Sequence, residues 1–252
     1  MRIATWNVNS IRVRVDQLAT LLQRYHIDTV LLQELKCANE VFPREMLEDL
    51  GYNCAVFGQK SYNGVAILSK HLIEDVTFGC DIFRGDSQAR YVEALVNGFK
   101  VASVYVPNGQ DVHFPAYMYK LKFLEILLNH LSKTIKIEKY IIGGDFNIAR
   151  SDLDVYDPQA WNGKVCCTER ERNAFEELLK IGLVDCQRVI SENDRIYTWW
   201  DYRSGHFAQN KGLRLDYILT TKDVLVKCGY VDTKTRTNIR PSDHAPVIVD
   251  VE

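Results

Sequence analysis

The pentapeptide Gly144-Asp145-Phe146-Asn147-Ile148 directly follows the apolar run Tyr140-Ile141-Ile142. Such a run predicts a buried β-strand, and the pentapeptide lies at its end. Because alternate residues of a strand point to the same face, we expect the side chains of Asp145 and Asn147 to lie together. A carboxylate and a carboxamide placed together suit hard-cation binding and phosphate contact. The same residue types are also typical of an ordinary turn, so other segments have to decide between the two interpretations.

Four other segments place polar or ionisable groups at the end or start of strand-like stretches. They are Thr5-Trp6-Asn7-Val8-Asn9, Leu31-Leu32-Gln33-Glu34-Leu35-Lys36, Leu213-Arg214-Leu215-Asp216-Tyr217 and Ser242-Asp243-His244-Ala245-Pro246. Together with the pentapeptide, they resemble the exonuclease III family of apurinic/apyrimidinic (AP) endonucleases, within the endonuclease/exonuclease/phosphatase superfamily. The resemblance runs from Arg2 to Val249, so we expect residues 1–252 to form one domain of that superfamily.

The composition is that of a globular protein without a membrane span. Of the 252 residues, 46% are hydrophobic, and no apolar stretch approaches the length needed to cross a bilayer. No linker or repeat divides the chain, and it opens directly into a strand-like run without a signal peptide. The seven cysteines include no CxxC pair, which favours free thiols in a reducing compartment over a disulfide framework or zinc site. We therefore expect a cytoplasmic, monomeric protein.

The formal net charge of −2 is unusual for a nucleic-acid enzyme, because phosphate contacts usually come from a basic surface. The charge of the whole chain does not describe one face, however, and an active site would hold several of the carboxylates. Basic residues also cluster, at Arg12/Arg14, Arg170/Arg172, Lys211/Arg214 and Lys234/Arg236/Arg240. These clusters permit DNA binding without demonstrating it.

Strand-like and helix-like patterns alternate along the chain. Strands are predicted at residues 28–33, 52–58, 64–69, 91–97, 99–106, 139–143, 215–220, 224–231 and 246–251. Helices are predicted around Leu18–Tyr25, between Pro43 and Gly51, from a capping box at residues 168–171 to Gly182, and along the stripe Tyr117, Leu121, Leu124, Leu128 and Leu131. This mixture indicates an α/β or α+β domain. The resemblance implies a four-layered sandwich, in which two packed mixed sheets are flanked by helices and loops from both sheets form the site at one edge.

Glu34 ends a run too apolar to face solvent, where an unpaired carboxylate would be costly. It also fits a plain loop residue at the end of a strand. The resemblance matches it to the Glu of the family's LQE-x-K segment, the main ligand of a magnesium ion. Mg²⁺ takes one or two protein carboxylates besides waters and phosphate oxygens, so one dedicated Glu is enough. The resemblance thus implies Mg²⁺ as cofactor, with Mn²⁺ as an expected substitute. The residues expected around the metal are Asn7, Glu34, Asp145, Asn147, Asp243 and His244.

Further roles follow from the same resemblance. Asn7 is expected to hydrogen-bond Asp145, which would activate or orient the attacking water. Asn147 would donate to the phosphate or the leaving oxygen as charge builds up there. His244 would pair with Asp216, whose carboxylate fixes the imidazole tautomer and favours its charged form.

The resemblance also implies a set of DNA contacts. Tyr105 matches the tyrosine of the Y-x-P-N segment, whose hydroxyl reaches the scissile phosphate, and Asn108 approaches the DNA backbone. Trp199 matches an aromatic residue that lines the slot for an extruded abasic sugar, whereas Trp200 fits the core. Some members carry a second aromatic residue where this chain has Leu213. Basic side chains expected on the DNA are Lys211 and Arg214.

These roles predict a magnesium-dependent DNA-repair phosphodiesterase that cuts duplex DNA 5′ to abasic sites and trims 3′ ends as a 3′→5′ exonuclease. Two alternatives stay open. The superfamily includes inositol-phosphate and sphingomyelin phosphodiesterases, although the L-Q-E-L-K and Y-V-P-N-G segments favour the DNA-repair branch. A non-catalytic DNA-binding or scaffold protein would have lost a central residue, whereas Glu34, Asp145 and His244 are all present.

Overall fold

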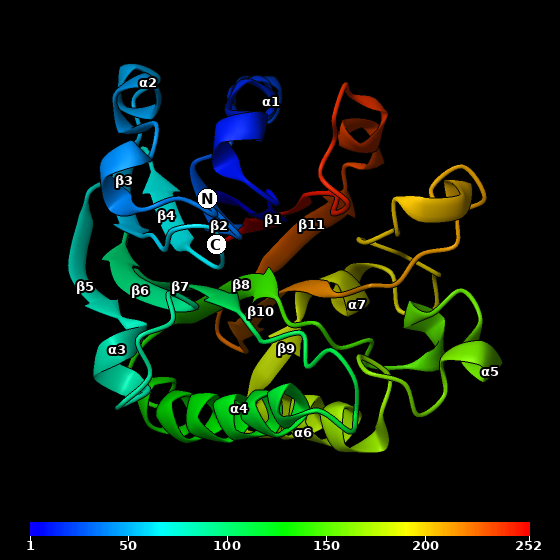
Figure 1. Cartoon of the computed structure of the whole chain (residues 1–252). Helices are drawn as coiled ribbons and strands as arrows, with labels where there is room; N and C mark the ends of the chain where they lie inside the picture. Colours follow the sequence, from blue (N-terminus) through cyan, green and yellow to red (C-terminus); the bar gives the residue numbers. More distant parts are fainter.

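Two packed β-sheets form the centre of the computed structural model, which describes residues 1–252 (Figure 1). The strands of the first sheet are β1 (Arg2–Asn7), β2 (Thr29–Gln33), β3 (Asn53–Phe57), β4 (Val65–Ser69), β11 (Val226–Val231) and β12 (Val247–Val251). Their spatial order is β11-β12-β1-β2-β4-β3. The strands of the second sheet are β5 (Ile73–Phe78), β6 (Tyr91–Val96), β7 (Phe99–Tyr105), β8 (Tyr140–Asp145), β9 (Leu183–Asp185) and β10 (Asp216–Thr221). Their order is β5-β6-β7-β8-β10-β9.

Helices cover the outer faces of both sheets, which gives four layers (Figure 1). The first sheet carries α1 (Ile11–Tyr25) and α2 (Arg44–Asp49), and the second carries α4 (Pro115–Thr134) and α6 (Glu169–Lys180). The shorter helices are α3 (Gly79–Ile82), α5 (Pro158–Trp161) and α7 (Cys186–Ile190). Three clusters of buried apolar side chains fill the spaces between the layers, and each sheet contains one parallel strand pair. The predicted sandwich of two mixed sheets is confirmed. None of the helices is both long and apolar enough to cross a membrane.

The strand register brings polar strand ends together at one edge of the sandwich. In the first sheet, β1 and β2 run parallel, so Asn7 and Glu34 lie at neighbouring strand ends. In the second sheet, Asp145 at the end of β8 is in register with Tyr105 on β7 and with Asp216 on β10. Each sheet therefore delivers its polar residues as one fixed group, since a slip of one residue would turn them to the opposite face.

The capping box that predicted α6 is present. The Thr168 hydroxyl accepts the N–H of Glu171 at 3.2 Å, and the Glu171 carboxylate accepts the N–H of Thr168 at 3.0 Å. The chain leaves the helix at Gly182, whose φ of +119° favours glycine. These local signals fixed both ends of α6 correctly.

The buried face of α4 differs from the predicted stripe. The side chains that it buries are Tyr117, Lys120, Phe123, Leu124, Leu127 and Leu131, whereas Leu121 and Leu128 are only half-buried. A lysine has no place in an apolar pattern, so the periodicity selected the neighbouring leucines instead. All the predicted strands are present with slightly shifted ends, but β5 and β9 were not predicted. β5 is an edge strand with exposed polar residues, and β9 has three residues.

Candidate active site

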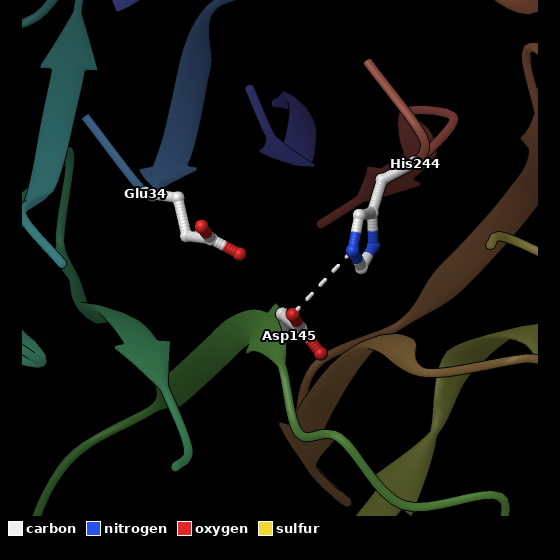
Figure 2. Close-up of side chains that lie close together, drawn as sticks. All are labelled: Glu34, Asp145 and His244. Carbon is white, nitrogen blue, oxygen red and sulfur yellow. Dashed lines mark ion pairs between the residues drawn. The ribbon is translucent and has the colours of Figure 1, made fainter. Parts of the chain in front are cut away.

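Glu34, Asp145 and His244 meet at the edge where the two sheets come together (Figure 2). Glu34 follows β2, Asp145 ends β8, and His244 precedes β12, so the cluster draws on both sheets. One ligand atom from each side chain lies within 4.8 Å of the others. Among these three side chains an ion pair joins His244 Nε2 and Asp145 Oδ2 at 3.7 Å, the dashed line in Figure 2.

Asn7 connects the two carboxylates of this cluster. Its buried side-chain amide donates to Glu34 Oε1 at 2.8 Å and to Asp145 Oδ2 at 2.9 Å. The hydrogen bond expected between Asn7 and Asp145 is therefore present. A single neutral donor holds the two acidic groups from opposite sheets at a fixed separation.

Glu34 adopts a strained backbone conformation. Its φ of +51° lies in the left-handed region, as does the φ of +53° at Lys36. Such a conformation costs about 1–3 kcal/mol and persists where neighbouring contacts enforce it. Here the N–H of Leu35 donates to Gly64 O at 3.1 Å, and the Lys36 ammonium lies 2.8 Å from Glu34 Oε2. These contacts hold the Glu34 carboxylate within the cluster.

Asp145 and Asn147 come together for a different reason from the one expected. β8 ends at Asp145, and Asn147 lies beyond the strand with a φ of +52°, so strand alternation does not apply. Instead, the Asn147 N–H donates to Asp145 Oδ1 at 2.9 Å, and its side-chain amide donates to Asp145 Oδ2 at 3.3 Å. Asparagine tolerates this left-handed conformation better than most residues. The expected proximity is confirmed, and a turn produces it.

His244 and Asp216 form the expected pair. His244 Nδ1 lies 2.8 Å from Asp216 Oδ2, which also accepts the Thr198 hydroxyl at 2.6 Å. Burial favours the neutral imidazole, but the carboxylates of Asp216 and Asp145 outweigh it and raise the pKa of His244 to about 10. The ring is therefore a charged donor at neutral pH. In this charged form Nε2 carries a proton and donates a hydrogen bond, whereas the neutral ring would offer Nε2 to a metal, so the expected metal role of His244 stays a prediction.

Burial acts in the opposite sense on Asp145. It raises the pKa of this carboxyl to about 7, opposed by the His244 charge and reinforced by that of Asp216. Tyr105 lines the same cavity, and its pKa is well above the usual value because of burial and the nearby Glu34 and Asp145 charges. Its phenol thus stays a hydrogen-bond donor. A bound cation would lower the pKa of Asp145 again by favouring the carboxylate.

A cavity of about 600 Å³ opens beside the cluster. Its walls include Asn108 and Trp199, as expected, together with Trp161 from α5. The rings of Trp161 and Trp199 meet edge to face, with their centres 6.5 Å apart. Leu213 lies in the wall as well, so Trp161 supplies a second aromatic surface to a pocket where this chain has leucine. Trp200 is buried in the core, as predicted.

Asp243 lines the cavity without joining the cluster. Its Oδ1 accepts the side-chain amide of Asn9 at 2.9 Å, and its Oδ2 accepts the indole N–H of Trp199 at 3.0 Å. Both oxygens are therefore engaged in positioning Trp199 and the loop after β1. The structure does not bring Asp243 into the group of candidate metal ligands.

The prediction that Arg214 contacts DNA is wrong. Its side chain has no exposed surface and forms ion pairs with Asp154 at 2.6 Å and with Asp185 at 2.7 Å. Lys211 is half-buried and stays a predicted contact, although it does not line the cavity. Sequence reasoning missed Lys164 and Arg203, which do line it. Neither residue lies in a recognisable motif, so no sequence signal pointed to them.

The donor set fits a small divalent cation. Glu34 and Asp145 supply carboxylate oxygens beside an open cavity, which suits an ion that keeps several waters and binds phosphate oxygens. The set contains no thiolate, and two of its three members are carboxylates, the ligands that hard cations prefer. The residues present therefore support metal binding at this edge of the sandwich.

Comparison with known proteins identifies the group to which this site belongs. The endonuclease/exonuclease/phosphatase family model matches residues 4–244. The chain belongs to this family. It is 36% identical to the exodeoxyribonuclease III of Haemophilus influenzae, over 98% of both chains. A solved 3′ phosphatase from Neisseria, bound to a product DNA hairpin, is 40% identical with a TM-score of 0.98, covering 100% of this chain and 99% of that one. An AP endonuclease from Archaeoglobus fulgidus is 36% identical with a TM-score of 0.96, covering 100% and 99%.

These likenesses decide among the three functions left open by the sequence. Within the family, this chain is a phosphodiester hydrolase of the exonuclease III and AP endonuclease group, as predicted. The similar Neisseria structure was solved with a product DNA hairpin bound. Glu34, Asp145 and His244 lie together, so the chain has not lost the central residue that the scaffold alternative requires. The relatives named are DNA nucleases and a 3′ phosphatase, which favours the DNA-repair branch over the lipid-phosphodiesterase alternative.

Proposed function

We propose that this nuclease cleaves duplex DNA on the 5′ side of abasic sites and trims 3′ ends, with Mg²⁺ as its cofactor and Mn²⁺ as a substitute. One observation carries the proposal. Two carboxylates bridged by Asn7 face a charged imidazole across the mouth of a cavity with two tryptophan walls. Acidic groups for a cation, a donor for a phosphate and a slot for a sugar thus lie side by side.

The phosphate is bound by donors that the fold holds ready. His244 presents Nε2–H while Asp216 holds the opposite ring nitrogen, and the charged ring stabilises the negative charge that increases during hydrolysis. Tyr105 offers its phenol from the end of β7. Each preorganised donor of this kind supplies about 2.7–4 kcal/mol in comparable sites.

Asp145 orients the attacking water and accepts its proton. A bound cation favours the ionised form of Asp145, and an ionised carboxylate can take up a proton from water. Asn147 keeps the carboxylate in place through both its backbone and side-chain N–H groups. When bound at Glu34 and Asp145, Mg²⁺ supplies Lewis-acid stabilisation of the phosphate.

The sugar of the lesion lies against Trp199, with Trp161 closing the slot from α5. Indole faces suit an extruded deoxyribose because they offer apolar contact without requiring a base. All these groups come from one chain, so we propose that the protein acts as a monomer.

A single assay tests the proposal. Purified protein with Mg²⁺ is given labelled duplexes that carry one abasic site, an undamaged blunt end, or a 3′-phosphate. We expect incision 5′ to the abasic site and shortening from the 3′ end. Activity confined to the 3′-phosphate would replace this proposal by a 3′-phosphatase, the function named for the similar Neisseria protein. Cleavage of none of these substrates would contradict the proposal.

A further inference from the structure

Lys120 is a fully buried cation beneath the active site. It lies on the inner face of α4, and its side chain has no exposed surface. Its ammonium donates to Asn147 O at 2.7 Å and to Asn108 O at 3.1 Å, and it pairs with Glu171 at 2.5 Å. The three donors of the ammonium are thereby all used. Two of them go to backbone carbonyls of loops that line the catalytic cavity.

Glu171 extends the same connection to a third loop. Its Oε1 also accepts the N–H of Cys166 at 3.0 Å, and Cys166 lies in the cavity wall. Its Oε2 accepts the N–H and hydroxyl of Thr168, which anchors it at the start of α6. One buried ion pair therefore joins two outer helices to three separate loops of the cavity.

The two carbonyls held by Lys120 belong to residues whose side chains also meet. Asn108 Nδ2 donates to Asn147 Oδ1 at 2.9 Å, and Asn147 has a left-handed backbone. A carbonyl fixed by a cation sets the orientation of the following peptide, and this limits where the asparagine side chain can point. The Asn147 amide in turn contacts Asp145.

We propose that Lys120, paired with Glu171, is a positioning residue for the nuclease reaction, which fixes Asn147 and Asn108 relative to the catalytic carboxylate. This inference rests on the proposed function. The attachment of α4 and α6 to the fold does not depend on the pair alone, because both helices contribute to one buried apolar cluster that includes Phe123, Leu124 and Phe175. A buried ion pair also adds little stability over apolar residues of similar size, so its use here is geometric.

The test replaces both charges together. Lys120→Met with Glu171→Gln leaves no unpaired buried charge, and glutamine preserves the capping box of α6. We expect a folded protein whose kcat on abasic duplex falls by about tenfold to a hundredfold, as misplacement of a catalytic group produces. Its KM for DNA should change little. The matched control is Lys122→Met with Glu125→Gln, an exposed pair on the same helix, which should retain wild-type kcat.

Coupling to Asn108 and Asn147 separates positioning from mere support of the fold. In an Asn108→Ala, Asn147→Ala background the paired replacement should cost little further, because both groups that it positions are gone. Equal losses in both backgrounds, or no loss of kcat in the wild-type background, would overturn the proposal. If the paired variant does not fold, Glu171→Gln alone is measured in the two backgrounds against the same criteria. An inactive wild type and control would instead count against the proposed function.

Discussion

Replacing Arg214 by methionine removes a cation that the core holds between two buried carboxylates. The guanidinium lies 2.6 Å from Asp154 and 2.7 Å from Asp185, and its centre lies 4.4 Å from the centre of the Tyr217 ring. Methionine keeps much of the apolar side-chain volume. The main loss is therefore the charge together with its hydrogen bonds, and the two carboxylates remain buried.

The size of the effect follows from what is left behind. Breaking one side of a buried ion pair costs about 3–5 kcal/mol, because the partner charge stays in the interior. Arg188 still pairs with Asp154 at 2.5 Å, and Arg150 lies 3.7 Å from Asp185. These second cations place the expected loss in the free energy of unfolding at about 3 kcal/mol. For a chain of this size, that lowers Tm by about 6–12 °C.

Thermal unfolding followed by circular dichroism measures Tm, and fluorescence anisotropy at several salt concentrations measures DNA affinity. Well below Tm, Arg214→Met should bind DNA with the wild-type salt dependence, because the side chain cannot reach a phosphate. Lys211→Met is the comparison, since loss of a phosphate contact should leave Tm unchanged and reduce the salt slope by about 1. An unchanged Tm together with a reduced slope for Arg214→Met would refute the buried role.

Three further predictions concern the site and its acid stability. Glu34→Gln should remove most nuclease activity without changing Tm, and a raised Mg²⁺ concentration should restore part of it. EDTA should abolish cleavage by the wild type, and full activity in EDTA would exclude a metal mechanism. Asp216→Asn should lower kcat, and His244→Asn should lower it more, by about a hundredfold. In single-turnover experiments the double variant should be as slow as His244→Asn, because the two residues act as a unit. Losses that multiply in the double variant would show that they act independently. Burial would raise the pKa of Asp154, but Arg214 and Arg188 lower it below its usual range. The ionised Asp154 carboxylate therefore stabilises the folded protein above about pH 4, and this stabilisation is lost as the pH falls through the folded pKa. In Asp154→Asn the free energy of unfolding should depend less on pH below about pH 4 than in the wild type. An unchanged pH dependence would count against this linkage.

The sequence predicted the site well where strand ends carry its residues. Asn7, Glu34, Asp145 and Asp216 all lie at the ends of apolar runs, and a sheet can only bring such ends to its edges. The pairing of His244 with Asp216 came from the resemblance, since nothing in the local pattern joins residues that are 28 positions apart. Asp145 and Asn147 were rightly placed together, although the strand ends at Asp145, two residues before the position that the alternation requires.

The sequence pattern did not predict that two cationic side chains are buried. Arg214 stands between two leucines in an alternating run, which is typical of a side chain on a solvated face. Its partners Asp154 and Asp185 are 60 and 29 residues away, so only the folded chain shows that this position is enclosed. Lys120 was missed in the same way, because an apolar helix stripe gives no place to a charge whose partners lie on other elements.

The charges around the site explain how a protein with a net charge of −2 can act on a polyanion. The anionic groups there outnumber the cationic ones: the carboxylates belong to Glu34, Asp111, Asp145, Asp201, Asp216 and Asp243, and the cations to Lys36, Lys164, Arg203 and His244. A phosphate that approaches this edge without a metal meets net negative charge, even though the imidazole favours it. A divalent cation at Glu34 and Asp145 would balance the excess and lower the pKa of Asp145, leaving the carboxylate free to orient water. The same acidic groups that make the chain acidic overall thus create the need for the cation, and overall charge is a poor guide to phosphate binding in this enzyme.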